Sequence, residues 1–102
     1  MTNEEMLYLA KRVVVVNYNE NRAEEAEELT MENTAIVWFS KTLQNFKALV
    51  ITTLPDDLYY EVTYDGDNNQ IYLDVYNKIF NQAYNVEIKA HKEEEPAEEE
   101  AE

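Results

Sequence analysis

Carboxylates and amides around the single glycine are the side chains best placed for metal chemistry in this sequence of 102 residues. Asp65, Asp67, Asn68 and Asn69 surround Gly66, and oxygen ligands of this kind suit Ca²⁺ or Mg²⁺. An EF-hand loop places its glycine after several ligands and ends in a bidentate glutamate, and this segment does neither. We therefore interpret it as a turn and predict no metal site and no cofactor.

Groups suited to nucleophilic or acid–base catalysis are scarce. The chain has no cysteine and one histidine, His91, which stands beside the acidic C-terminus. Ser40 has no evident histidine partner to activate it, and a single glycine cannot form a phosphate-binding loop. We predict that the protein is not an enzyme.

The charge balance is strongly acidic, with 22 Asp and Glu against 8 Lys and Arg, a net charge of −14. Seven of these acids lie in the last ten residues, so residues 1–92 carry −7. Lys and Arg supply most of the affinity for phosphate groups, so we expect no direct binding to nucleic acid or anionic lipid. No apolar run approaches the roughly 20 residues of a membrane span, and the N-terminus lacks a basic region. We expect a cytoplasmic protein with no membrane partner.

The N-terminal segment predicts a helix. Thr2 and Glu5 have the spacing of a capping box. An apolar stripe follows at helical spacing and consists of Met6, Leu9, Ala10, Val13 and Val16 or Asn17. The four consecutive valines, residues 13–16, favour a strand because they are β-branched. We prefer the helix because the cap and the stripe agree.

An acidic stretch, residues 19–33, follows this helix. It holds six glutamates and one base, Arg22, and we interpret it as a linker or a solvated helical extension. Four of its glutamates are candidates for binding a protein partner: Glu24, Glu25, Glu27 and Glu28.

The middle of the chain predicts three strands. Residues 35–39 and 46–53 are rich in branched and aromatic side chains, and the polar segment 42–45 suits a hairpin connection. Pro55, Asp56 and Asp57 predict a turn. In the third strand Leu58, Tyr60, Val62 and Tyr64 alternate with Tyr59, Glu61 and Thr63. This alternation predicts a half-buried strand with one solvated face.

Residues 70–84 fit two interpretations. Asp67 and Gln70 have the spacing of a second capping box, and a helical stripe follows through Tyr72, Val75, Tyr76, Ile79, Phe80 and Ala83. The alternation of Ile71, Leu73 and Val75 supports a strand instead. The helix is our preferred interpretation, and the strand stays open.

The predicted fold is α+β, a single domain in the order α-β-β-β-α, with both helices on one face of an antiparallel three-stranded sheet. Val86, Ile88 and Ala90 could add a short fourth strand. Residues 1–88 form the domain, with the acidic linker inside it, and residues 89–102 form a disordered acidic tail. Double-stranded-RNA-binding domains share this order, but the segment 67–70 lacks the basic residues that they need.

The aromatic side chains divide between core and surface. We expect Trp38 and the tyrosines 60, 64, 72 and 76 in the core. Tyr59 should lie on the open face of the sheet with Glu61 and Thr63, where an aromatic ring beside carboxylates suits a protein interface.

The middle of the chain resembles a known family. The similarity covers about residues 36–82 and is carried by Trp38-Phe39-Ser40-Lys41-Thr42-Leu43-Gln44-Asn45-Phe46-Lys47-Ala48-Leu49, Thr52-Thr53-Leu54-Pro55-Asp56, Tyr59-Tyr60-Glu61-Val62-Thr63-Tyr64-Asp65-Gly66-Asp67 and Tyr72-Leu73-Asp74-Val75-Tyr76. These stretches resemble small uncharacterised proteins, labelled as a domain of unknown function, that phages and prophages of Gram-positive bacteria encode. The resemblance implies a phage setting and supplies no catalytic residues.

Two functions are consistent with these observations. In the first, the protein is a phage accessory protein that binds a host protein. That partner could have a basic nucleic-acid-binding groove, and the protein would then be a DNA-mimicking inhibitor of the anti-restriction or anti-CRISPR type. In the second, the open sheet face forms a homodimer, the role is structural, and the acidity serves only solubility.

Overall fold

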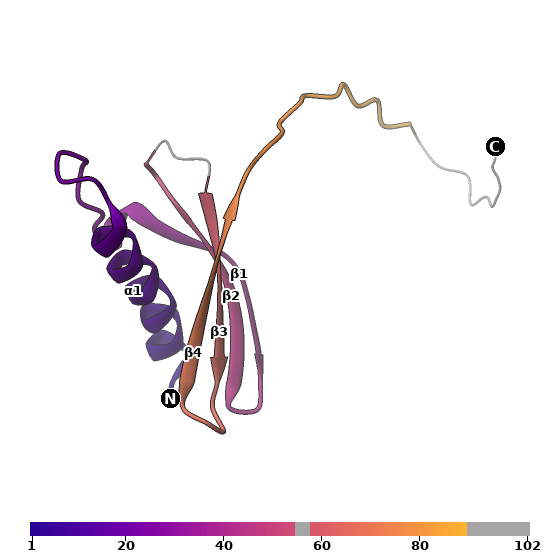
Figure 1. The fold of residues 1–102 in the computed structure, drawn as a ribbon. Helices are drawn as coiled ribbons and strands as arrows, with labels where there is room; N and C mark the ends of the chain where they lie inside the picture. The colour runs from indigo at the N-terminus through magenta and orange to yellow at the C-terminus, as the bar shows by residue number, and fades with distance from the viewer. Residues whose placement is uncertain (55–57, 90–102) are drawn as a thin grey trace.

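The computed structural model describes residues 1–54 and 58–89. Its elements are helix α1 (Asn3–Asn21), the 3-10 helix η1 (Met31–Asn33) and strands β1 (Thr34–Thr42), β2 (Asn45–Thr52), β3 (Leu58–Asp65) and β4 (Gln70–Asn77). The strands form one antiparallel sheet in the order β1-β2-β3-β4, and α1 lies against one face of it (Figure 1). The chain is a single α+β domain, as predicted.

Helix α1 begins at the predicted capping box. The Thr2 N–H donates to Glu5 Oε1 (2.7 Å), and the Glu5 N–H donates to Thr2 Oγ1 (3.1 Å). The bond from the Thr2 backbone holds the pKa of Glu5 below its ordinary value. The buried residues of the helix are Met6, Ala10, Val14 and Val15. Two of the valines are therefore accommodated in a helix because their side chains are buried against the sheet, while Leu9 and Val13 pack at the margin.

The core lies between α1 and the first three strands. Its strand residues alternate strictly along β2 and β3: Phe46, Ala48, Val50, Tyr60, Val62 and Tyr64. The register places these residues opposite one another, with Phe46 opposite Tyr64 and Val50 opposite Tyr60. This is the half-buried pattern that the sequence predicts for residues 58–64, and Tyr60 and Tyr64 are core residues as expected.

The prediction of a second helix was wrong. Residues 70–77 form β4, which pairs with β3 without a break from Asp65 opposite Gln70 to Leu58 opposite Asn77. Asp67 begins no helix because the segment 65–69 forms the turn of a hairpin. Asp65 Oδ1 accepts from the Asp67 N–H (3.1 Å), and Asn68 Nδ2 donates to Asp65 Oδ2 (2.8 Å). The Asn68 bond holds the pKa of Asp65 below its ordinary value.

The described sheet therefore has four strands rather than three, and α1 is the helix that covers it. The fourth strand is β4 and not the segment around Val86, because residues 78–89 carry no regular structure. The order α-β-β-β-β also differs from that of a double-stranded-RNA-binding domain. The predicted turn at residues 55–57 and most of the predicted tail, residues 90–102, lie outside the described residues.

The tips of the two hairpins meet at the same end of the sheet. The Gln44 side chain donates to Asp67 Oδ1, and the Gly66 N–H donates to Asn45 Oδ1 (2.8 Å). A Cβ atom on Gly66 would overlap the Gln44 backbone and side chain, so this tip contact requires glycine there. Leu43, at the first tip, has a positive φ of 56°.

Candidate protein-binding surface

The open face is the side of the sheet that faces away from α1. Tyr59, Glu61 and Thr63 of β3 lie on it, as predicted, because they alternate with the buried residues of the same strand. The register extends this face to the neighbouring strands. It adds Lys47, Leu49 and Ile51 from β2, and Tyr72, Asp74 and Tyr76 from β4. Strand β4 therefore brings two tyrosines to the surface that the sequence prediction placed in the core.

A set of contacts fixes the centre of the open face. The rings of Tyr59 and Tyr76 stack with their centroids 5.0 Å apart. The Tyr76 hydroxyl donates to Glu61 Oε1 (3.1 Å), and Lys47 Nζ lies 3.4 Å from Glu61 Oε2. The hydrogen bond to Glu61 raises the pKa of Tyr76, because it favours the neutral phenol beside a carboxylate. Glu61 thus holds a lysine and a tyrosine in place on either side of it.

Trp38 is the main functional candidate that the sequence prediction missed. Its side chain is 47% exposed, although the apolar run around it suggested a core position. The reason is a β-bulge in β1, where the register shifts between Ile36 and Trp38. Ile36 lies opposite Val50 on the helix side, but Trp38 lies opposite Leu49 on the open face. A strict alternation cannot reveal this extra residue, Val37.

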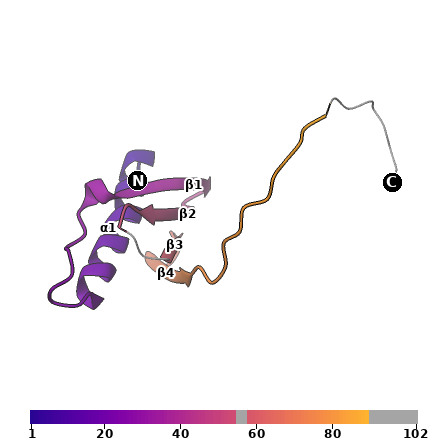
Figure 2. The same cartoon turned by 90° about the horizontal axis from the view of Figure 1, so that it is seen from above.

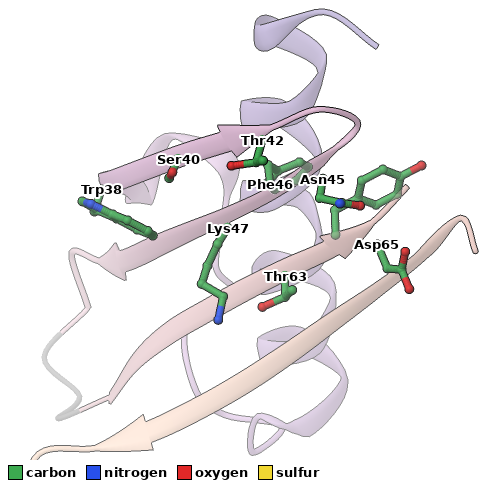
Figure 3. A pocket seen from close by; sticks show the side chains of 9 residues that line it. Trp38, Ser40, Thr42, Asn45, Phe46, Lys47, Thr63 and Asp65 are labelled. Atoms are coloured by element: carbon green, nitrogen blue, oxygen red, sulfur yellow. The ribbon is translucent and has the colours of Figure 1, made fainter. Parts of the chain in front are cut away.

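A shallow groove of about 470 Å³ runs over β2 between Trp38 and Asp65. Figure 3 shows the groove with α1 behind the sheet. The Lys47 side chain extends from β2 toward β3, where Thr63 lies beside it. The groove offers one aromatic wall, one cation and several hydroxyl groups. Such a mixture suits contact with a protein surface.

The acidic candidates lie elsewhere. Glu24, Glu25, Glu27 and Glu28 are exposed in the loop between α1 and η1, which lies on the helix side of the sheet (Figures 1 and 2). The structure therefore does not bring them together with Tyr59, Glu61 and Thr63.

This loop is folded rather than a solvated linker. The Asn19 amide donates to Leu29 O and accepts from the Leu29 N–H, both at 2.9 Å, and Leu29 is buried. Arg22 Nη1 donates to three carbonyl groups, those of residues 23, 24 and 26. These bonds hold the backbone, while the glutamate side chains project into solvent.

Within residues 1–54 and 58–89, no three His, Asp or Glu side chains are grouped so as to hold a metal ion. In the same part of the chain, no helix has both the length and the apolar character needed to cross a membrane.

Comparison with known protein families gives a match. A family model described as "Family of unknown function (DUF6275)" matches residues 7–86, which include most of α1, the whole sheet and part of the segment beyond it. No curated protein and no solved structure matches the chain. The matched range contains every residue of the open face named above.

Proposed function

Because the chain belongs to the DUF6275 family of unknown function, we propose its role from its own surface: it is a non-enzymatic protein that binds another protein through the open face. The observation that carries this proposal is the exposure of four large aromatic residues on one face of the sheet. Their exposed fractions are 47% for Trp38, 40% for Tyr59, 51% for Tyr72 and 41% for Tyr76. Tryptophan and tyrosine are enriched among the residues that contribute most to binding energy at protein interfaces.

The contacts around Glu61 make this surface suitable for recognition. The stacked pair Tyr59–Tyr76 and the bonds to Glu61 restrict these side chains before any partner arrives. A surface that is already ordered loses less conformational entropy on binding. The open face would therefore act as a preformed aromatic patch with a polar border.

The setting that we propose is a phage or prophage protein acting on a host protein in the bacterial cytoplasm, as the resemblance of residues 36–82 implies. DNA mimicry is the narrower form of this proposal. The open face supports it weakly, because the Glu61 carboxylate is paired with Lys47 and the glutamates 24–28 lie on the other side of the sheet. Contact through aromatic side chains is the better supported mode.

Site-specific photocrosslinking in host lysate tests the proposal. A benzophenone amino acid replaces Tyr72, which is exposed on the open face, or in a matched control Tyr8, which is exposed on α1. We expect one host protein to crosslink from position 72 and not from position 8. Crosslinking of the same protein from position 8 alone would place the interface on the helix side and contradict the proposal.

The purified partner then allows a quantitative comparison. Trp38→Ala combined with Tyr59→Ala should raise the dissociation constant about tenfold or more, whereas Tyr8→Ala should leave it unchanged. Titration at low and high salt separates the two modes of binding. Two results together would support DNA mimicry: a steep loss of affinity at high salt, and a similar loss of affinity after charge reversal of Glu61 and of the four loop glutamates.

A further inference from the structure

The segment after β4 carries several large apolar side chains that are exposed. Figures 1 and 2 show this segment, here called the arm (residues 78–89), running away from the sheet. Five of its side chains are at least 71% exposed: Ile79, Phe80, Tyr84, Val86 and Ile88. Exposure of so many large apolar side chains in so short a segment indicates a site of interaction.

The arm has the sequence pattern of a β-strand. From residue 80 onward the even positions are mainly apolar and carry Phe80, Gln82, Tyr84, Val86 and Ile88. The odd positions carry Asn81, Ala83, Asn85, Glu87 and Lys89. This period of two residues is typical of a strand with one buried face, yet the described sheet ends at Asn77. The arm therefore has the pattern of a strand with one buried face, but it is not part of the described sheet.

The two edges of the sheet differ in how well they are protected. The β1 edge contains the bulge at Val37 and a lysine, Lys41, and both features discourage the addition of another strand. The β4 edge has eight residues in unbroken register, with no lysine, proline or bulge. Val75 in this strand is 47% exposed because α1 packs on β1, β2 and β3. The β4 edge is thus open to a further strand.

The charges point to a second copy of the chain as the partner. Residues 1–77 contain 5 Lys and Arg and 14 Asp and Glu, a net charge of −9. Residues 78–92 contain three lysines and one glutamate, a net charge of +2. The arm therefore begins a weakly basic stretch of an acidic molecule, and the acidic body of another copy is complementary to it.

The sequence disfavours return of the arm to its own β4 edge. A tight hairpin needs residues with positive φ directly after the strand, usually Asn-Gly or Asp-Gly. Residues 78–80 are Lys, Ile and Phe, and the arm has no glycine. The edge of another molecule requires no such turn.

We propose that the arm of each chain adds as an antiparallel strand to the outer edge of β4 in a second copy, so that two chains exchange arms in a symmetric dimer. The exchange satisfies backbone groups of the β4 edge and buries the apolar positions of the arm. Because each copy gives and receives an arm, the interface closes on itself and needs no third chain. This proposal uses a different surface from the open face and does not depend on the proposed host partner.

Sedimentation equilibrium of the full chain, over a wide concentration range, tests the exchange. We expect a mass of twice 12.0 kDa at high concentration. The double variant Gln82→Pro/Asn85→Pro removes one backbone N–H at an even position and one at an odd position. Because alternate N–H groups of the arm would point toward β4, one hydrogen bond between the arm and β4 is lost in either register. It should raise the dimer dissociation constant about tenfold or more, and the matched control Gln82→Ala/Asn85→Ala should not.

A second variant tests the receiving edge. Val75→Lys protects β4 with a charge and should weaken the dimer to a similar extent, while Tyr8→Lys on α1 should have no effect. Unchanged circular dichroism spectra for both variants would show that the fold is retained.

Isotope-filtered NMR on a mixture of labelled and unlabelled chains identifies the contact directly. We expect nuclear Overhauser effects from the labelled methyl groups of Val86 and Ile88 to unlabelled β4. A monomer at every concentration, or a dimer that neither Gln82→Pro/Asn85→Pro nor Val75→Lys weakens, would overturn the proposal. Contacts between the arm and β4 within a monomer would overturn it as well.

Discussion

Tyr59 and Tyr60 are neighbours in β3 with the same side chain, yet one is 40% exposed and the other 1%. Their exposed fractions differ because their side chains lie on opposite faces of the sheet. On the helix side, apolar side chains from α1, β2 and β3 form the buried core, whereas on the open face hydrogen bonds and ring stacking hold the tyrosines. The residues that stabilise the fold and the residues that we propose for partner binding therefore lie on opposite faces, so substitutions can separate the two roles.

The largest expected effect lies in β3. Tyr60→Ala should lower the free energy of unfolding by about 2–5 kcal/mol, because it leaves a cavity in the core. Tyr59→Ala should lower it by about 1 kcal/mol or less, since that ring is partly solvated. Urea denaturation of both variants measures the difference. Equal losses would show that both faces are buried and that the open face is not available for binding.

The next effect concerns the loop on the helix side. Asn19→Ala removes both hydrogen bonds to the Leu29 backbone and should cost about 1–2 kcal/mol, because a part-buried N–H and carbonyl lose their partner. Asn21→Ala, an exposed position on the same helix, is the control and should cost about 0.5 kcal/mol or less. If both variants have the same stability as the parent, the hydrogen bonds between Asn19 and the Leu29 backbone do not stabilise the acidic loop.

The open face predicts an effect on titration. Glu61→Gln should bring the pKa of Tyr76 down toward its ordinary value, because the carboxylate that favours the neutral phenol is gone. The raised pKa means that the folded state retains this proton longer than the unfolded state. Its contribution to stability is thus complete below the ordinary tyrosine pKa of about 10 and is lost as the pH rises through the folded pKa.

NMR titration of the Tyr76 ring measures this shift. Glu32→Gln, which lies outside the open face, is the matched control and should leave the titration of Tyr76 unchanged. A curve that is identical in parent and Glu61→Gln would mean that the two side chains are not coupled in solution.

The smallest effect belongs to the first hairpin tip, where the two faces end. Leu43 has a positive φ and is exposed, so Leu43→Asn should raise the free energy of unfolding by about 0.5 kcal/mol, since asparagine tolerates this conformation better. Thermal unfolding would detect the gain. A loss would indicate that the leucine side chain makes a contact that outweighs the backbone strain.

Local signals in the sequence predicted the parts of the fold that local chemistry determines. The Thr2–Glu5 capping box identified the start of α1, and the alternation from Leu58 to Tyr64 identified the two faces of β3. Tyr59 was correctly placed on the open face for the same reason.

The errors arose where the pairing between strands, rather than the pattern within one segment, decides the structure. The spacing of Tyr72, Val75 and Tyr76 fits a helix, while the alternation in the same segment fits a strand, and pairing with β3 decides in favour of the strand. The bulge at Val37 moved Trp38 to the surface, and no residue type marks its position. The stacking of Tyr59 on Tyr76 also required the register, which a single sequence does not reveal.

The tip contact has a consequence for the kinetics of folding. Each hairpin joins strands that are adjacent in sequence, so β1–β2 and β3–β4 can form by short loop closures. The bonds from Gln44 and Asn45 to the second turn exist only after both hairpins have formed and β2 has found its register on β3. We therefore expect these bonds to slow unfolding more than they speed folding. Because they join the two hairpin turns, these bonds would stabilise the completed sheet at this end.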